Sequence, residues 1–427
     1  MRGKKWGPDL AALRHRDFAF YVSANFLTTI ALQIQATALA WQIYAITDDP
    51  FQLGLVGLAE FLPAALLALP AGHLADRIDR RRLILIGVTA ELFAALLLVF
   101  LGSTDRITEV AILALALCFG IARAISTPAA RALMPNLMPK GHLAGAVAWS
   151  STSWQVATIA GPGVGGVLYS GLAGLLGPET PAVAYGGAAL CFAGAVLLFF
   201  LMRGRQVASV ARNAGGDLAA ILAGLVLIFR NRLLLSTISL DLFAVLFSGA
   251  TALIPVFAQD ILHVGADAGG LLRSAQGFGA TATALLLTQF PLQRHVGRRL
   301  FMAVGLFGVA AIVFGLSRSY WLSFAALLVL GAGDMVSVYI RGTLVPLATP
   351  DELRGRVTAV ESVFIGASNE LGMFVAGTGG ALLGPVTAVL VGGSMTLLIT
   401  LSWAGLFPNL RRLDRFLDLH GSAGPQG

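Results

Sequence analysis

Charged residues are scarce in this chain. Asp, Glu, Lys and Arg make up 12% of its 427 residues, whereas hydrophobic residues make up 57% and the mean hydropathy is +0.81. Soluble domains carry about 25% charged residues, so the composition excludes an ordinary soluble protein of two or three domains. It is typical of a chain that crosses a membrane several times.

Cysteine and histidine are also rare. The two cysteines, Cys118 and Cys191, lie within apolar stretches and predict no disulfide framework. The six histidines lie in expected loops or at the ends of apolar stretches, and no H-E-x-x-H, G-x-S-x-G or P-loop motif occurs. The sequence therefore predicts no metal site, no cofactor, no nucleophile and no ATP site, and we do not expect an enzyme.

Long apolar stretches, in contrast, are abundant. About 20 apolar residues suffice for a helix to cross the hydrocarbon core of a bilayer. The stretches lack the alternation of membrane β-barrel strands, so we expect helices. We interpret the first stretch as a retained helix and not as a secretory signal, because it is long and eleven more follow. The expected spans are 17–44, 52–74, 82–102, 109–135, 144–170, 180–202, 232–260, 268–291, 298–317, 320–347, 356–384 and 386–408.

Lysine and arginine are unevenly distributed around these spans. With the N-terminus in the cytoplasm, 23 of the 29 basic residues fall in cytoplasmic segments, and only Arg106 and Arg318 fall outside. This is the positive-inside pattern, and it places both termini in the cytoplasm. It also accounts for the net charge of +7, which could otherwise suggest a nucleic-acid partner.

The two halves of the chain resemble one another at an offset close to 214 residues. The matches, in order, are Arg14-x-Arg16 with Arg230-x-Arg232, ATAL at 36–39 with 250–253, Pro135-x-x-x-Pro139 with Pro346-x-x-x-Pro350, and GVGGVL at 163–168 with GTGGAL at 377–382. Ordered repeats at one offset indicate a duplicated unit. Paired bundles that rock around a central cavity are the architecture of secondary carriers.

We therefore expect an all-α polytopic membrane protein with 12 transmembrane helices in two six-helix pseudo-repeats. The expected parts are an N-terminal bundle at 1–202, a cytoplasmic linker at 203–231, a C-terminal bundle at 232–408 and a cytoplasmic tail at 409–427.

Several motifs resemble those of one transporter family. GHLADRIDRRRL at 72–83 resembles the major facilitator superfamily signature G-x-L-a-D-R-x-G-R-R, with Asp79 where the pattern usually has Gly. GPGVGG at 161–166 resembles the helix-five motif of superfamily exporters. The segments RHRDF at 14–18, STPAARALMPNLMP at 126–139 and TPDELRGRV at 349–357 are similar to the branch of enterobactin exporters and macrolide-efflux-like carriers.

The resemblance implies a cytoplasmic gate and a helix-packing motif. The gate residues would be Gly72, Asp76, Arg77, Arg80 and Arg81, with Asp76 and Arg77 latching against the start of the eleventh helix. There, TPDE at 349–352 predicts a capping box with Thr349 as N-cap, and Gly355 a break before the helix. The packing motif of helix five would be Gly161, Pro162, Gly165 and Gly166, whose small residues let helices approach closely.

Ionisable residues at membrane depth are costly, so each needs an explanation. A buried carboxylate either locks two helices in an ion pair or exchanges a proton as a cavity alternates. Among the carboxylates we favour Asp241 as the proton site, followed by Asp334, Glu370 and Glu60. Glu91, in a span that the family arrangement turns toward lipid, should pair inward or be protonated.

Other residues are candidates for the cavity wall. Asn25, Thr29, Gln33 and Thr37 recur every four residues and form a polar stripe on the first span. Arg123 and Arg341 are the candidate cationic contacts, and Asp334 lies seven residues before Arg341, on the same helix face.

We therefore expect a proton-coupled secondary carrier that exports drug-like or siderophore-like amphiphiles from a bacterial cytoplasmic membrane. Its partners would be small molecules, protons and lipid, with neither a nucleic acid nor an obligatory protein partner. An uptake carrier for a polar nutrient is an alternative. A sensor without transport is another, although the linker and tail are short for a signalling domain.

Overall fold

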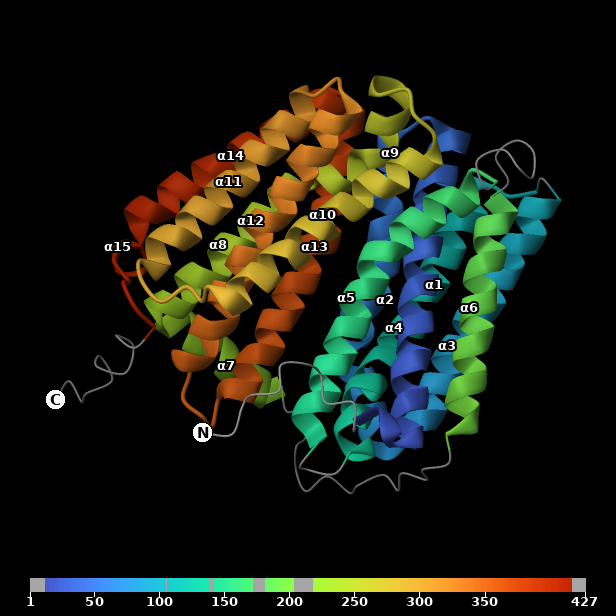
Figure 1. The fold of residues 1–427 in the computed structure, drawn as a ribbon, viewed down its shortest axis with the longest axis horizontal. Helices are drawn as coiled ribbons and strands as arrows, with labels where there is room; N and C mark the ends of the chain where they lie inside the picture. Colours follow the sequence, from blue (N-terminus) through green and yellow to red (C-terminus); the bar gives the residue numbers. More distant parts are fainter. Residues whose placement is uncertain (1–11, 105, 139–141, 172–180, 203–217, 417–427) are drawn as a thin grey trace. The chain divides into compact units, whose positions relative to one another are not determined.

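The computed structural model contains helices and no strand in the residues that it describes, 12–104, 106–138, 142–171, 181–202 and 218–416. Twelve long helical segments match the expected spans to within three residues at each end (Figure 1). The first six are α1 (Arg16–Thr47), α2 (Pro50–Arg77), α3 (Arg80–Ser103), α4 (Glu109–Leu133), α5 (Leu143–Tyr169) and α6 (Pro181–Leu201). The second six begin with α8 (Arg232–Ser248) and its continuation, and proceed through α10 (Ala266–Gln289), α11 (Val296–Leu316), α12 (Tyr320–Leu347), α13 (Arg354–Leu383) and α14 (Pro385–Leu406).

Eight segments of the described chain are long and apolar enough to cross a membrane by composition alone. The remaining long helices are α1, α5, α10 and α13. Among them, α1 has the polar stripe and α13 has Glu361 and Glu370. Such helices still cross a bilayer when their polar side chains face protein and not lipid.

The helices form two compact units. The first comprises Met1–Gln42, Leu62–Gly215 and Ala266–Gly270, and the second comprises Ile43–Phe61, Gly216–Gly265 and Leu271–Gly427. In the first unit α3 packs most extensively on α4 and α6, and in the second unit α11 packs in the same way on α12 and α14. Because these helices correspond across the sequence repeat, the two units share one packing pattern.

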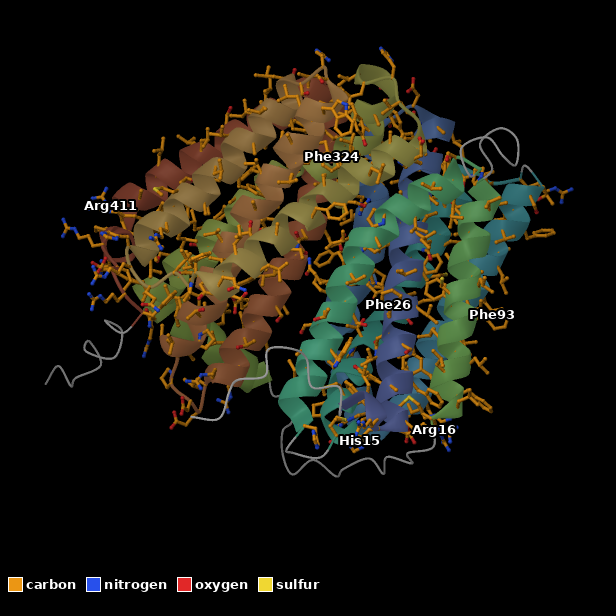
Figure 2. All side chains as sticks on the ribbon, viewed as in Figure 1. His15, Arg16, Phe26, Phe93, Phe324 and Arg411 are labelled. Carbon is orange, nitrogen blue, oxygen red and sulfur yellow. The ribbon has the colours of Figure 1, made fainter. Side chains whose placement is uncertain are left out.

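Apolar side chains cover the outer flanks of the helices. Phe93 on α3 is 66% exposed and Leu190 on α6 is 75% exposed. Figure 2 shows carbon-rich flanks, as at Phe93, while polar atoms gather toward helix ends, as at Arg16 and Arg411. This distribution suits contact with lipid. Glu91 also lies on α3, but at 1% exposure it is buried against protein.

The turn before α3 is capped by the residue that departs from the family pattern. Asp79 is the N-cap of α3, and its Oδ1 accepts a hydrogen bond from the Arg81 backbone N at 2.9 Å. Its φ of −52° needs no glycine. The aspartate therefore stabilises the start of α3 where a glycine would contribute no side-chain acceptor.

We expect Asp79→Ala to lower the free energy of unfolding by about 1 kcal/mol, because the cap acceptor is lost. Asp79→Asn keeps an acceptor at the same position and should stay close to wild type. Thermal unfolding of the purified protein in detergent micelles compares the two. An Ala variant as stable as the Asn variant would contradict the capping role.

The seventh span is broken, although the sequence predicts one continuous helix. α8 ends at Ser248, and its C-cap Gly249 has a φ of +22°. The short elements η4 (Ala250–Leu253), α9 (Ile254–Val256) and the π-helix η5 (Phe257–Ile261) follow. A Cβ at Gly249 would lie 2.4 Å from the Ala376 Cβ of α13. The continuous apolar pattern concealed the break, because hydrophobicity does not report the close approach that requires this glycine.

Two local predictions, for the linker and for the segment before α13, were incomplete or wrong. The linker contains α7 (Leu218–Arg230), a helix that we did not expect, and Ile228 of α7 packs in a core cluster with Leu234 and Val357. The capping box at 349–352 is wrong. Thr349 Oγ1 instead donates to the Val345 carbonyl at 2.7 Å, and α13 begins at Arg354 with no side-chain cap.

Gly355 is likewise inside α13 and does not mark a break before it. The hydroxyl of Thr349 is already used to close the last turn of α12, so it is not available to the next helix.

The segment after α14 packs against the second unit. Within α15 (Pro408–Arg411), Leu410 is fully buried. Asp414 Oδ1 accepts a hydrogen bond from the His295 backbone N at 2.9 Å, and the Asp414 and Leu413 carbonyls accept from Val296 and Gly297. This segment therefore satisfies amide groups at the start of α11 that have no partner within their own helix.

Candidate functional site

Three ionisable side chains from three helices meet in the second unit. Arg341 of α12 pairs through Nη1 with Asp241 Oδ2 of α8. Its Nε lies 3.2 Å from Glu361 Oε1 of α13. Ser337 Oγ, one turn before Arg341, donates to Asp241 Oδ1 at 3.3 Å. We call Asp241, Ser337, Arg341 and Glu361 the acid–arginine cluster.

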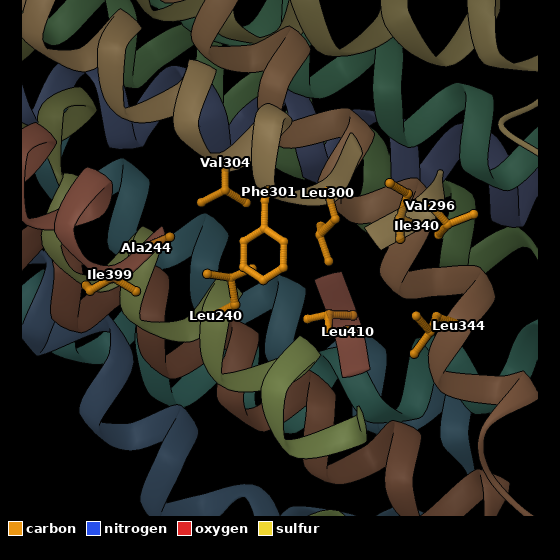
Figure 3. Packing of buried hydrophobic residues seen from close by; sticks show 10 residues of the cluster. All are labelled: Leu240, Ala244, Val296, Leu300, Phe301, Val304, Ile340, Leu344, Ile399 and Leu410. Carbon is orange, nitrogen blue, oxygen red and sulfur yellow. The ribbon is translucent and has the colours of Figure 1, made fainter. Parts of the chain in front are cut away.

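Apolar packing on both sides fixes the backbone at this cluster. Leu240 and Ile340, which directly precede Asp241 and Arg341, lie in one buried cluster with Phe301 of α11 (Figure 3). Val360, directly before Glu361, belongs to a second buried cluster with Ile238. Each of the three charged residues therefore directly follows a buried apolar residue. The packing of that apolar residue fixes the backbone, and the charged side chain points into the cluster.

The acid–arginine cluster is buried and has an excess of acid. Arg341, Asp241 and Glu361 are 5%, 7% and 9% exposed. With all three ionised, one guanidinium faces two carboxylates, so the net charge is −1. Such a charge is poorly tolerated in a low-dielectric interior unless a proton or another cation compensates it. The arrangement can therefore hold and release one positive charge.

A small pocket adjoins the cluster. The space among its side chains, about 160 Å³ when its open side is included, is too narrow to admit a water molecule in this structure. The residues that line it are Ile238, Asp241, Leu242, Arg341, Glu361, Phe364 and Ile365.

Two further predicted carboxylates share a second arginine. Glu60 of α2 and Glu370 of α13 both act electrostatically on the Arg273 guanidinium of α10. Glu60 is 8% exposed, and a Cβ placed on Gly57 would lie 3.8 Å from Glu370 Oε2. This grouping again has one guanidinium and two carboxylates.

Asp334, the remaining proton candidate, differs from the other three carboxylates because it belongs to neither grouping. It lies on α12, seven residues before Arg341, and is partly buried. Within the described ranges it makes neither an ion pair nor a hydrogen bond. The structure thus separates the four predicted carboxylates into one in the acid–arginine cluster, two around Arg273 and one alone.

The cavity candidates of the first unit have structural contacts of their own. Asn25 Nδ2 donates to the Tyr21 carbonyl at 3.0 Å, one turn earlier on α1. Gln33 packs against α5, because a Cβ on Gly161 would lie 2.3 Å from the Gln33 Cβ. Arg123 lies on α4 and is partly buried. The structure places these three residues on two helices of the unit.

The glycines of the helix-five motif stand at close approaches within the first unit. A Cβ on Gly165 would lie 2.9 Å from the Ile34 Cα of α1, and one on Gly166 would lie 2.2 Å from the Ala266 carbonyl oxygen. Pro162 is inside α5. Any larger side chain at these glycines would require the neighbouring backbone to move.

Two of the predicted gate arginines bind the ends of helices. Arg80 Nη1 donates to the Ala132 carbonyl at 2.8 Å, in the last turn of α4. Arg81 Nε donates to the Phe199 carbonyl at 2.8 Å, in the last turn of α6, and its Nη2 contacts the Phe200 carbonyl. Both arginines therefore satisfy carbonyls at the negative ends of helices.

The other gate residues are at the end of α2. Gly72, Asp76 and Arg77 lie in its last turns, and their side chains fall outside the described part of the chain. The described residues contain no group of three His, Cys, Asp or Glu side chains able to hold a metal ion.

Sequence reasoning missed three members of these groupings. Glu361 and Arg273 lie within expected spans, but neither was identified as a partner of Arg341, Glu60 or Glu370. Ser337 was not considered. A signal existed for Ser337, because it lies on one helix face with Asp334 and Arg341. Pairing between helices, however, depends on tertiary packing that spacing along one helix does not reveal.

Known proteins resemble this chain over most of its length. The family model described as "Transmembrane secretion effector" matches residues 8–421. The enterobactin exporter of Citrobacter koseri is 26% identical over 421 residues, which cover 96% of this chain and 97% of the exporter. The staphyloferrin A transporter of Staphylococcus aureus is 26% identical over 298 residues, 69% of this chain and 72% of that protein.

Solved structures share the fold. A bacterial homologue of the iron transporter ferroportin superposes with a TM-score of 0.71 at 14% identity, covering 93% of this chain and 99% of that one. A bacterial homologue of the lysosomal transporter Spinster gives 0.69 at 17% identity, covering 95% and 97%. The chain therefore belongs to the transmembrane secretion effector family and is a multi-pass secondary transporter of the major facilitator type.

Proposed function

We propose that this transporter exports amphiphilic small molecules, drug-like or siderophore-like, in exchange for protons. The observation that carries the proposal is the buried acid–arginine cluster, in which two carboxylates share one guanidinium, so that one proton balances its charge. Relatives named as an enterobactin exporter and a staphyloferrin A transporter support efflux and the siderophore-like class. A secondary carrier needs a compensated charge of this kind to draw energy from a proton gradient.

In the proposed mechanism, protonation of the cluster changes the relative stability of two conformations. A ligand shifts a conformational equilibrium only by its different affinity for the two states, and a proton acts in the same way. When Asp241 or Glu361 gains a proton, Arg341 retains one full partner and releases the other. One of the helices α8 and α13 is then released from α12, while the other stays paired with it.

The remaining candidates have supporting roles in this proposal. Asp334, Glu60 and Glu370 are the further proton sites, and Asn25, Gln33 and Arg123 line the substrate path in the first unit. Asp76 and Arg77 form the cytoplasmic latch, with both termini in the cytoplasm and the protein in the bacterial inner membrane. Protons and substrate are the partners, and no second protein is required.

Retention of candidate compounds in cells tests the proposal. Cells with the protein should retain less compound than cells without it, and a protonophore should remove the difference. A panel of amphiphiles and siderophores is compared with polar nutrients in the same assay. Accumulation of a nutrient in cells with the protein would support the uptake alternative and contradict export. A difference that survives the protonophore would contradict proton coupling.

A further inference from the structure

Arginines from two distant segments meet at one end of the second unit. The segments 294–299 and 411–415 contain six arginines and a single acidic residue, Asp414. Backbone hydrogen bonds of 3.2 and 3.0 Å join the two segments. Their backbones are so close that a Cβ on Gly297 would lie 3.1 Å from the Arg411 carbonyl oxygen. The contact therefore concentrates positive charge here, and Figure 2 shows nitrogen-tipped side chains gathered around Arg411.

Most of this positive charge has no partner within the described chain. Four exposed arginines of the two segments form neither an ion pair nor a side-chain hydrogen bond there. We call them the arginine patch: Arg294, Arg298, Arg411 and Arg412. The acidic residue is already shared, because Asp414 Oδ2 lies 3.7 Å from the Arg415 Nε and Oδ1 accepts the His295 backbone N–H. An anion at the patch would therefore meet donors that are not otherwise used.

The neighbouring elements do not neutralise the arginine patch. α15, which ends at Arg411, packs against α8, α11 and α14. α14 has no charged residue, and α8 has a further arginine, Arg232, at its first position. The one carboxylate of α8, Asp241, is already paired with Arg341 in the acid–arginine cluster. Because like charges repel and a bound anion reduces that repulsion, the patch favours a negatively charged ligand.

An exposed apolar face continues from the arginine patch along α11. Arg298, Met302 and Leu306 follow one another at intervals of four residues and share this face. Met302 is 67% exposed and Leu306 is 45% exposed. Gly305 lies on the same face, and a Cβ there would meet no atom within 4 Å, so the space beside it is open. An acyl chain can lie against such a surface, whereas a free phosphate ion gains nothing from it.

We infer that the arginine patch binds the headgroup of an anionic phospholipid, whose acyl chain lies along the exposed face of α11. This site goes beyond the proposed function, because it involves neither the substrate nor the proton. A guanidinium presents its N–H donors in one plane and binds phosphate oxygens in pairs. Each arginine near a membrane surface strengthens the binding of an anionic lipid by about fivefold. A zwitterionic lipid also carries a cationic group, which the patch repels.

Lipids that share their acyl chains but differ in headgroup test the inference. The full-length protein in micelles of an uncharged detergent is heated with increasing amounts of dioleoylphosphatidylglycerol, dioleoylphosphatidylcholine, inorganic phosphate or glycerophosphoglycerol, the soluble headgroup. A ligand that binds only the folded state raises the unfolding temperature. Phosphatidylglycerol should act at a concentration about tenfold or more below that of phosphatidylcholine, and its effect should weaken at about 1 M salt. The two soluble anions should have little effect.

Single substitutions locate the site. Arg298→Gln and Arg411→Gln should each raise the half-maximal concentration of phosphatidylglycerol by about fivefold. Arg318→Gln is the matched control, because it removes the same charge beyond the opposite end of α11 and should behave like the wild type. All three side chains are exposed, so the variants should fold. Their unfolding temperatures without added lipid check this.

Three results would overturn the inference. Phosphatidylcholine that stabilises the protein at the same concentration would show that only the acyl chains matter. Inorganic phosphate that acts as well as the lipid would assign the arginine patch to a free anion. An Arg318→Gln variant that is weakened as much as Arg298→Gln would show a general effect of charge without a site. None of these measurements involves transport, so the retention experiment tests the proposed function separately.

Discussion

Arg341→Met should lower the free energy of unfolding by about 3–5 kcal/mol, because it leaves two buried carboxylates without their shared partner. Asp241 and Glu361 would then face one another in the interior without compensation. Denaturation of the purified protein in mixed micelles measures the loss. The loss should be smaller at pH 5 than at pH 8, since protons neutralise the stranded carboxylates at the lower pH.

A triple variant supplies the control for this prediction. In Asp241→Asn/Arg341→Met/Glu361→Gln every charge of the cluster is removed together, and replacement of a whole buried ion cluster by neutral groups is often close to neutral in stability. Most of the lost stability should therefore return. A single Arg341→Met variant as stable as wild type would show that the carboxylates do not depend on the guanidinium.

Asp241→Asn should abolish proton-driven accumulation of substrate, a loss of about tenfold or more in the concentration gradient. One guanidinium then faces one carboxylate, so the cluster is balanced without a proton and no longer responds to the gradient. Exchange of substrate down its own gradient should persist, because the helices remain packed. Vesicles loaded with a compound identified by the retention experiment measure both activities.

Asp351→Asn is the matched control, since it neutralises an exposed carboxylate on the same unit and should leave accumulation intact. If Asp241→Asn still concentrates substrate against a gradient, the proton site is elsewhere. The same assay on Asp334→Asn then tests the carboxylate of α12 that has no partner among the described residues.

The helical spans could be predicted from the sequence because their cause is local. A run of about 20 apolar residues between arginine-rich segments has few structural alternatives in lipid, and α12 begins and ends at the predicted residues. The family resemblance was likewise evident from short motifs, and the family model that covers residues 8–421 bears it out.

The features that could not be predicted from the sequence depend on contacts that a local pattern does not show. The break at Gly249 follows from the approach of Ala376, which is 127 positions away in the chain. The failure of Thr349 as an N-cap follows from its competing bond to Val345. The partnership of Arg341 with Glu361 joins two helices whose relative rotation no single helical pattern specifies, so sequence alone yielded the charges but not their pairing.

The packed segment after α14 limits where the C-terminal end of this chain can be truncated or fused to a reporter. Leu410 closes a hydrophobic core, and the backbone around Asp414 satisfies the first amides of α11. Truncating the protein directly after α14 for crystallisation would remove these packing contacts and hydrogen bonds. Fusing a reporter at the same point would disturb them. Reporters belong beyond residue 416, where these bonds are left intact.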